Sequence, residues 1–317
     1  ARASCTVVGS GAQGPDAMCV GSSPGTSQMM SASTAAREIL ERTRELGKDD
    51  LLLALLSGGG SSLLTLPAPG VSMATLKSLT SELLKSGATI QEMNTVRKHL
   101  SAIAGGRLAA ASRAPVLALI ISDVTGDDPT HIASGPCAPD PTTVQDARAV
   151  LERYGVDFEG PFAESPKPGD AVFARVPNRV TATAHRSLEA AAALFQREGI
   201  APVILGDTVT GEASQVAKVM AALVREIQRH GKPWPRPVAL ISGGETTVTL
   251  RAKGGKGGRN SEFLLAFALG VDGMAGIHAL AADTDGIDGS EDNAGAFADG
   301  TSVGRMRAAG IDAKAML

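Results

Sequence analysis

The sequence predicts an α/β protein with mostly parallel strands, divided into two domains. Short aliphatic runs repeatedly end at Gly, Ser or Asp and are followed by a helical pattern. Such runs are typical of parallel strands buried on both faces beneath helices. The 317 residues exceed one ordinary domain of about 150 residues. We therefore expect a larger N-terminal domain with helices on both faces of a mostly parallel sheet, and a smaller C-terminal α/β domain.

The expected elements alternate along the chain. Aliphatic runs predict strands at 51–56, 116–121, 202–205, 238–241 and 277–282. Between them, capping residues and apolar periodicity predict helices from Ser33 or Thr34 to Leu46, from Ser72 to near Gly87, from Thr89, and near 143–153, 187–198, 211–230 and 260–269. Thr89 and Glu92 have the spacing of a capping box.

The domain boundary is expected at the proline-rich segment 231–237, because prolines neither continue a helix nor fit a central strand. The predicted domains are therefore 1–235 and 236–317. Residues 1–30 are rich in Gly, Pro and Ser without a period that could bury a face, and we expect them to be loosely packed. Gly9–Gly14 formally matches GxGxxG, but no amphipathic helix pattern follows.

Composition narrows the class of partner. Few aromatic residues (3%), a net charge of −3 and a pI near 6.0 argue against nucleic acid. The longest aliphatic run, 51–56, is far below the roughly 20 residues of a membrane span. Three widely spaced cysteines form neither a disulfide framework nor a CxxC site, and no secretory signal is visible. We expect a cytoplasmic enzyme with small-molecule substrates, with oligomeric state open and a homo-oligomer possible.

Two glycine-rich segments follow predicted strands. Glycine exposes backbone N–H groups and lets a phosphate approach closely, although the same glycines also make ordinary tight turns. Ligands of open α/β sheets bind beyond the carboxyl ends of the strands. The candidate binding residues are Ser57, Gly58, Gly59, Gly60 and Ser61 in the first segment, and Gly243, Gly244, Glu245 and Thr246 in the second.

A cationic loop precedes the helix expected at 260–269. Lys256 lies among four glycines, followed by Arg259 and Asn260. Cations at a helix start oppose the helix dipole, so we expect an anion to compensate them. The guanidinium fork suits phosphate or carboxylate, although a basic hairpin tip is the alternative. The loop is not a Walker A motif, because Gly257 follows the lysine.

Two acidic turns offer hard oxygen ligands. Asp283, Asp285 and Asp288 suit Mg²⁺, which proteins hold with one or two carboxylates plus substrate phosphates. The alternative is a set of Asx turns. The turn that contains Asp123, Asp127 and Asp128 has the same ambiguity.

Helical spacing places Asn94, Arg97, Lys98 and Ser101 on one face. This face is either solvated or opposite an anion, and the residues alone leave both readings open. The five histidines match no metal-binding spacing.

Taken together, six segments resemble the glycerate 2-kinase family, and the resemblance extends from about Ala35 to near the end of the chain. The segments are Met93–Ser101, Ile121–Asp128, Ile132–Pro136, Leu240–Val248, Gly257–Asn260 and Ala281–Gly289. The resemblance implies a Rossmann-like N-terminal domain and a MOFRL C-terminal domain. Some members of this family are labelled hydroxypyruvate reductase.

The resemblance also implies an activity: ATP-dependent phosphorylation of glycerate to 2-phosphoglycerate with Mg²⁺. Arg259 and Lys256 would then stabilise the transferring phosphoryl group, and Asp123 or Asp285 would accept the hydroxyl proton. The alternatives are an NAD(P)-dependent hydroxypyruvate reductase and an inactive ligand-binding remnant.

The sequence departs from the family at both ends and at two internal positions. No counterpart is found for the family's N-terminal portion with a catalytic Lys or for its final Thr-Gly-Pro segment. We therefore expect an incomplete N-terminal domain and a truncated C-terminal domain. Ser261 replaces a usual Gln, and Ala104 replaces a common Lys.

Overall fold

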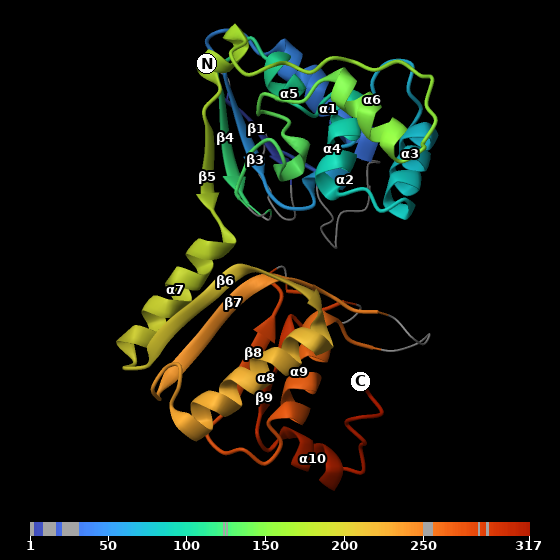
Figure 1. The fold of residues 1–317 in the computed structure, drawn as a ribbon. Helices are drawn as coiled ribbons and strands as arrows, with labels where there is room; N and C mark the ends of the chain where they lie inside the picture. Colours follow the sequence, from blue (N-terminus) through green and yellow to red (C-terminus); the bar gives the residue numbers. More distant parts are fainter. Residues whose placement is uncertain are drawn as a thin grey trace. The chain divides into compact units, whose positions relative to one another are not determined.

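The computed structural model describes residues 3–8, 17–20, 32–122, 124, 126–249, 256–284, 286–289 and 292–317, with the backbone alone for 3–8, 17–20 and Ser62. The chain forms two compact units, Ala1–Thr183 and Ala184–Leu317. In each unit helices pack against strands (Figure 1), which confirms the α/β class. No helix in the described ranges is long and apolar enough to cross a membrane.

The first unit contains a five-stranded sheet whose neighbouring strands are all parallel, in the order β2-β1-β3-β4-β5. The predicted strands at 51–56 and 116–121 are confirmed as β3 and β4. The strand bounds are Ala3–Val8 for β1, Ala17–Val20 for β2, Leu51–Leu56 for β3, Val116–Ile121 for β4 and Asn178–Ala182 for β5.

Two of these strands lie in the segment 1–30, which was expected to be loosely packed. Part of this segment nevertheless has regular structure: β1 pairs in parallel with β3 along its whole length, from Ala3 opposite Leu51 to Val8 opposite Leu56, and β2 pairs in parallel with β1. Thr and Val near the end of β1 favour an extended backbone. The GxGxxG segment Gly9–Gly14 lies outside the described residues.

The helices of the first unit begin where the sequence places capping residues. Thr89 and Glu92 form the expected capping box, and the Ser72 side chain accepts from the Thr75 N–H. The helical segments are α1 Ala32–Glu45, α2 Gly60–Leu63, α3 Met73–Lys85, α4 Ile90–His99, α5 Arg107–Ala110, η1 Ile132–Ser134, α6 Val144–Arg153 and η2 Ala171–Arg175.

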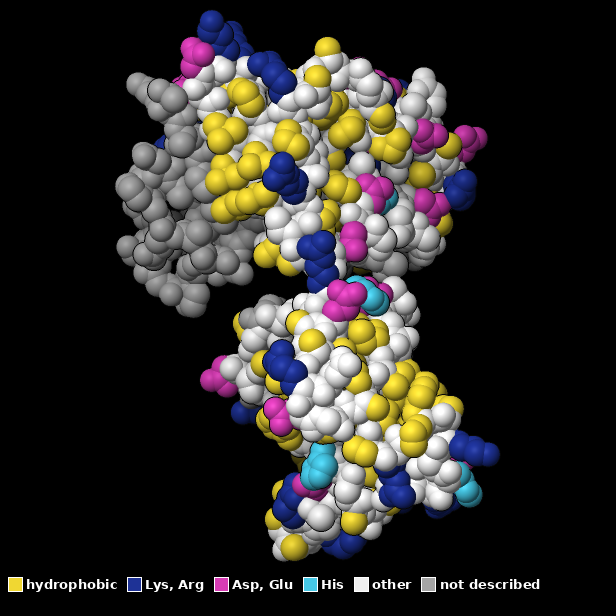
Figure 2. Space-filling view, turned by 90° about the vertical axis from the view of Figure 1, so that its left-hand side faces the viewer, with side chains coloured by type: hydrophobic (Ala, Val, Ile, Leu, Met, Phe, Trp, Pro, Cys, Tyr) yellow, Lys and Arg dark blue, Asp and Glu magenta, His cyan; other side chains and the backbone are white. Residues whose placement is uncertain are grey.

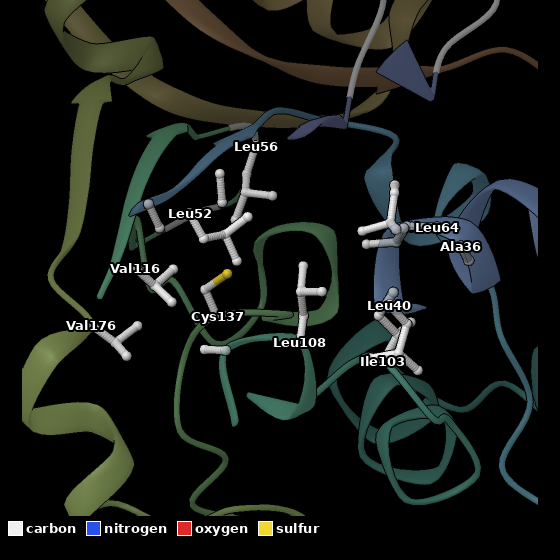
Figure 3. Close-up of a cluster of buried hydrophobic side chains, with 14 of the residues drawn as sticks. Ala36, Leu40, Leu52, Leu56, Leu64, Ile103, Leu108, Val116, Cys137 and Val176 are labelled. Carbon is white, nitrogen blue, oxygen red and sulfur yellow. The ribbon is translucent and has the colours of Figure 1, made fainter. Parts of the chain in front are cut away.

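The main core lies between the sheet and the helices that Figure 1 shows on one side of it. Leu52 and Leu56 of β3 point into this core with Val116 of β4 (Figure 3), and Leu40 of α1 belongs to the same cluster. Leu53, on the other face of β3, is only half-buried. The two faces of the sheet are therefore covered unequally within the described residues, whereas the sequence pattern predicted burial on both.

The second unit contains two separate pairs of strands. β6 and β7 are parallel, and β8 and β9 are antiparallel, so the C-terminal part is less purely parallel than predicted. The elements are α7 Ala184–Arg197, β6 Ala201–Glu212, α8 Ala213–His230, β7 Val238–Thr247, α9 Arg259–Gly270, β8 His278–Ala282, β9 Gly295–Asp299 and α10 Ser302–Ala308.

The structural division falls between Thr183 and Ala184, earlier than the boundary at 235/236 that the prolines suggested. The reason is pairing across the proline-rich segment, because β6 before it and β7 after it form one parallel ladder. The prolines therefore lie in a connection inside the second unit. In each unit, Figure 2 shows basic and acidic side chains interspersed on the visible surface.

Candidate functional site

The first glycine-rich segment forms a turn between β3 and α2. Gly59 has φ +74°, a backbone conformation that glycine adopts without steric cost, and α2 begins at the next residue. Ser61 lies in α2, where its Oγ is 2.8 Å from the Oγ of Ser134. Its carbonyl oxygen accepts from Arg97 Nη2 at 3.0 Å. Ser57–Ser61 therefore follow the strand as predicted, and α4 contacts this turn directly.

Arg97 and Asn94 lie together on α4. Arg97 Nη1 donates to Asn94 Oδ1 at 3.4 Å, and Asn94 is 6% exposed. Burial lowers the pKa of Arg97 from its ordinary value, but arginine stays protonated in proteins. A solvated face is therefore the wrong reading for this side of α4.

Lys98 is enclosed within the first unit. Its side chain is 1% exposed, and Nζ donates to Asp140 Oδ1 at 2.8 Å. Burial opposes ionisation of Asp140, but the hydrogen bond and charge of Lys98 outweigh it and hold the pKa of Asp140 below its ordinary value. This geometry argues against direct contact between Lys98 and a ligand, and it gives the residue a role in positioning α4.

The Lys98–Asp140 pair belongs to a larger polar network that extends from the buried interior to the half-exposed Glu164, and the sequence did not indicate it. Ser165 Oγ donates to Asp140 Oδ2 at 3.0 Å, and Lys167 Nζ lies 2.6 Å from Glu164 Oε1. His99, 0% exposed, lies 3.3 Å from the same carboxylate. Lys98 and His99 are distant in sequence from Asp140 and Glu164, and no motif connects them. The sequence offered one local signal for this network, the spacing of Asp140 and Thr142, which form an Asx-type turn.

Arg259 is the first residue of α9 and lies between two carboxylates. Nη1 is 2.5 Å from Glu245 Oε1 on β7, and Nε is 3.3 Å from Asp283 Oδ2, just after β8. The hydrogen bond to Glu245 is the largest cause of a raised pKa of Arg259, with Asp283 adding to it against partial burial. These two side chains supply negative charge of the kind that the sequence led us to expect near this cation.

Asp288 holds the beginning of α9. Its Oδ1 accepts from the Asn260 N–H at 3.0 Å, and its Oδ2 accepts from the Ser261 N–H at 2.8 Å and from the Ser261 hydroxyl. Burial raises the pKa of Asp288, but these hydrogen bonds outweigh it and the net shift is downward. Asp288 is 0% exposed and its oxygens are committed to the helix, so the geometry does not fit a metal ligand.

Glycines bring the acidic turn and the cationic loop together. A Cβ at Gly258 would lie 2.4 Å from Asp288 Oδ1, and a Cβ at Gly289 would lie 2.3 Å from the Gly257 carbonyl oxygen. Gly289 also has φ +68°. The two backbones therefore approach more closely than any side chain would allow. Asn260 Nδ2 bridges the same elements by donating to Asp283 at 3.0 Å and to Asp288 at 3.3 Å.

The second glycine-rich segment is not the loop that the sequence predicted. Gly243, Gly244, Glu245 and Thr246 continue β7, and Glu245 pairs with Thr210 of β6. Gly244 has φ +136°, and a Cβ there would lie 2.1 Å from the Val209 carbonyl oxygen, so glycine lets the strand continue past an irregular stretch of β6. Its backbone is committed to a strand rather than to a phosphate-binding turn.

The remaining predicted site residues are less defined. Lys256 is exposed. Asp123 and Asp285 lie outside the described residues. Within the described ranges, no group of three or more His, Cys, Asp or Glu residues could hold a metal ion.

Fold and site define a two-unit α/β protein with one polar cluster at the turn after β3 and another at the start of α9. Family models match both parts of the chain. A domain of unknown function, DUF4147, matches residues 9–163, and the MOFRL family matches residues 238–317. The MOFRL match begins at Val238, close to the boundary suggested by the prolines.

Relatives match most of the chain. A protein of Agrobacterium vitis, provisionally named a hydroxypyruvate reductase, is 49% identical over 91% of this chain and 76% of its own length. The glycerate 2-kinase of Pyrococcus horikoshii is 41% identical over 89% of this chain and 66% of its own length. The crystal structure of glycerate kinase from Thermotoga maritima has a TM-score of 0.84 at 35% identity, covering 98% of this chain and 76% of that one.

The chain belongs to the glycerate 2-kinase family, and it matches both the DUF4147 and the MOFRL models. It spans 66% of the Pyrococcus relative, just under two thirds of that protein.

Proposed function

We propose that this chain acts as an ATP-dependent glycerate 2-kinase, which converts glycerate to 2-phosphoglycerate. The observation that carries the proposal is Arg259, held at the start of α9 by Glu245 and Asp283. Phosphoryl transfer depends mainly on positioning and on charge stabilisation, and a guanidinium fixed in this way supplies both. The kinase names of relatives over most of the chain support the same reaction.

The reaction needs few covalent events. The 2-hydroxyl oxygen of glycerate bonds to the γ-phosphorus of ATP, and the bond from that phosphorus to the β–γ bridging oxygen breaks, releasing ADP. The hydroxyl proton passes to a carboxylate, for which we propose Asp123 or Asp285.

The described residues have separate roles in this proposal. Arg259 uses Nη1 and Nε for its carboxylate partners, which leaves Nη2 to donate to a phosphoryl oxygen. Lys256 adds a second positive charge from an exposed position. The proposed binding residues for nucleotide and substrate are Ser57, Gly58, Gly59, Gly60, Ser61, Asn94, Arg97 and Asn260, with Lys98 and Glu245 as supports behind them; Gly243, Gly244 and Thr246 are removed from this role because they continue β7.

One of the predicted Mg²⁺ ligands, Asp283, has a carboxylate oxygen available for the ion. Asp283 uses Oδ2 for Arg259 and Asn260, while its Oδ1 has no hydrogen bond within the described part of the chain. We propose that Asp283 holds Mg²⁺ together with phosphate oxygens and water, as is usual for this ion. Asp288 is removed from this role by its commitment to α9, and Asp285 stays a proposed ligand. The ion would neutralise charge on the nucleotide phosphates.

A comparison of cosubstrates tests the proposal. The purified chain is incubated with ATP, Mg²⁺ and glycerate, and in parallel with NADH or NADPH and hydroxypyruvate. We expect glycerate-dependent formation of ADP and 2-phosphoglycerate. Oxidation of the nicotinamide cofactor without phosphoryl transfer would establish the reductase instead, and ligand binding without turnover in either arm would establish an inactive remnant.

We place the reaction in the reducing cytoplasm, which suits the buried free thiol of Cys137.

A further inference from the structure

Arg97 carries a charge that the described part of the chain does not neutralise. Its guanidinium has five N–H groups, and its described hydrogen bonds go only to the Ser61 carbonyl oxygen and to Asn94. No carboxylate lies within 4 Å of it among the described residues. Arg107 is a useful contrast. It donates to three backbone carbonyl oxygens, and although burial lowers its pKa, the negative charges of Asp140 and Glu164 act in the opposite direction.

A pair of hydroxyl groups lies against the same turn. Ser61 Oγ and Ser134 Oγ are 2.8 Å apart. One hydroxyl must donate to the other, so one of the two protons is left for a further acceptor. Ser134 is only 4% exposed, whereas Ser61 is half-buried, so the available proton is best placed on Ser61. Arg97 and Ser61 thus offer donors from neighbouring positions.

The backbone that presents Ser134 is unusual. Ala133 and Ser134 have φ of 51° and 59°, which residues other than glycine rarely adopt. Hydrogen bonds hold this conformation, with the Gly105 N–H donating to the Ser134 carbonyl oxygen at 3.0 Å and the Gly106 N–H donating to that of Gly135 at 2.7 Å. Such conformations persist where surrounding structure fixes them, often at ligand sites. Here the result is a buried hydroxyl aimed at Ser61.

We propose that Arg97, Ser61 and Ser134 form the subsite for the carboxylate of a 2-hydroxy acid, an assignment that rests on the proposed function. One net positive charge suits a carboxylate monoanion better than a polyphosphate, because the neighbouring Lys98 is already neutralised by Asp140. The guanidinium fork also matches the planar carboxylate. Ser134 acts through Ser61 as a positioning residue, while Arg97 and Ser61 contact the ligand.

Steady-state kinetics with separate substrate titrations provide the first test. Arg97→Lys and Ser61→Ala are expected to raise KM for glycerate about tenfold or more, and Ser134→Ala by a smaller factor, with KM for ATP unchanged. Arg113→Lys, an exposed arginine of the same unit, is the matched control. A rise confined to KM for ATP would make the site a phosphate subsite and overturn the proposal, as would unchanged constants in all three variants.

Thermal unfolding with glycerate separates this proposal from the proposed activity. Glycerate should raise the Tm of the unaltered chain and of Arg113→Lys, and this shift should be lost in Arg97→Lys. Glycerol, which lacks the carboxylate, should give no shift in any variant. If glycerate stabilises the chain but no phosphoryl transfer occurs, only the kinase proposal fails. If glycerate does not stabilise the unaltered chain, the carboxylate subsite is overturned.

Discussion

Lys98 Nζ lies 2.8 Å from Asp140 Oδ1, and the two side chains are 1% and 0% exposed. Removing two charges from water costs several kcal/mol per ion, which is recovered only when the remaining hydrogen-bonding capacity is also satisfied. Asp140 meets this condition, because Thr142 and Ser165 donate to it as well. The pair ties α4, and with it Arg97, to a segment about forty residues further along the chain.

The first prediction concerns the free energy of unfolding. Lys98→Met should destabilise the chain by about 3–5 kcal/mol, because it leaves Asp140 buried and unpaired. Asp140→Asn should also destabilise it, and the double variant should cost clearly less than the sum of the two single changes. Denaturant unfolding of all four proteins measures this coupling. Additive costs would show that the two charges do not depend on each other.

The second prediction concerns acid. Lys167 and the Val144 N–H outweigh burial and lower the pKa of Glu164 to about 2, from an ordinary value of 4.5. A carboxyl group whose pKa is lowered by folding stabilises the fold at pH values above its pKa in the unfolded chain. This stabilisation is lost as the pH falls from about 4.5 through about 2. Denaturant unfolding at pH 6, 4 and 3 should show Glu164→Gln losing less stability than the unaltered chain over this window. The difference should be small, since Glu164 is half-exposed; equal losses would contradict it.

The third prediction concerns catalysis by Arg259. Arg259→Lys should lower kcat by about two to three decades, or about 3–4 kcal/mol of transition-state stabilisation, because lysine lacks the planar fork. KM for glycerate should change little. Arg305→Lys is the control, since Arg305 is an exposed arginine that also pairs with a carboxylate, that of Asp299. A change confined to KM would assign Arg259 to ground-state binding.

The fourth prediction concerns backbone approach at the start of α9. Gly258→Ala should cost about 1–3 kcal/mol or more, because its Cβ would meet Asp288 and the Gly289 backbone. Kinase activity should fall with it, since Arg259 is the next residue. Gly304→Ala in α10 is the control: nothing lies within 4 Å of its Cβ, and an alanine inside a helix should be neutral or stabilise by about 0.5–1 kcal/mol. Similar behaviour of both variants would refute the steric argument.

For the candidate site, the sequence proposed Arg259, Asn260 and Asp283 because their residue types carry a recognisable chemistry, and the structure places Arg259 and Asn260 against Asp283. It could not assign their partners. Asp288 looked like a metal ligand, yet its oxygens hold the helix start. Lys98 looked like an anion ligand, yet it is paired with Asp140.

The sequence by itself determined the α/β class, the strands at 51–56 and 116–121 and the helix starts at Ser72 and Thr89, since aliphatic runs and capping residues act locally. Tertiary structure decided which strands pair: β7 extends to Thr247 because β6 lies beside it. It also decided the burial of Arg97 and the contact between Ser61 and Ser134. These features join residues far apart in the chain, and such contacts depend on packing that no local pattern encodes.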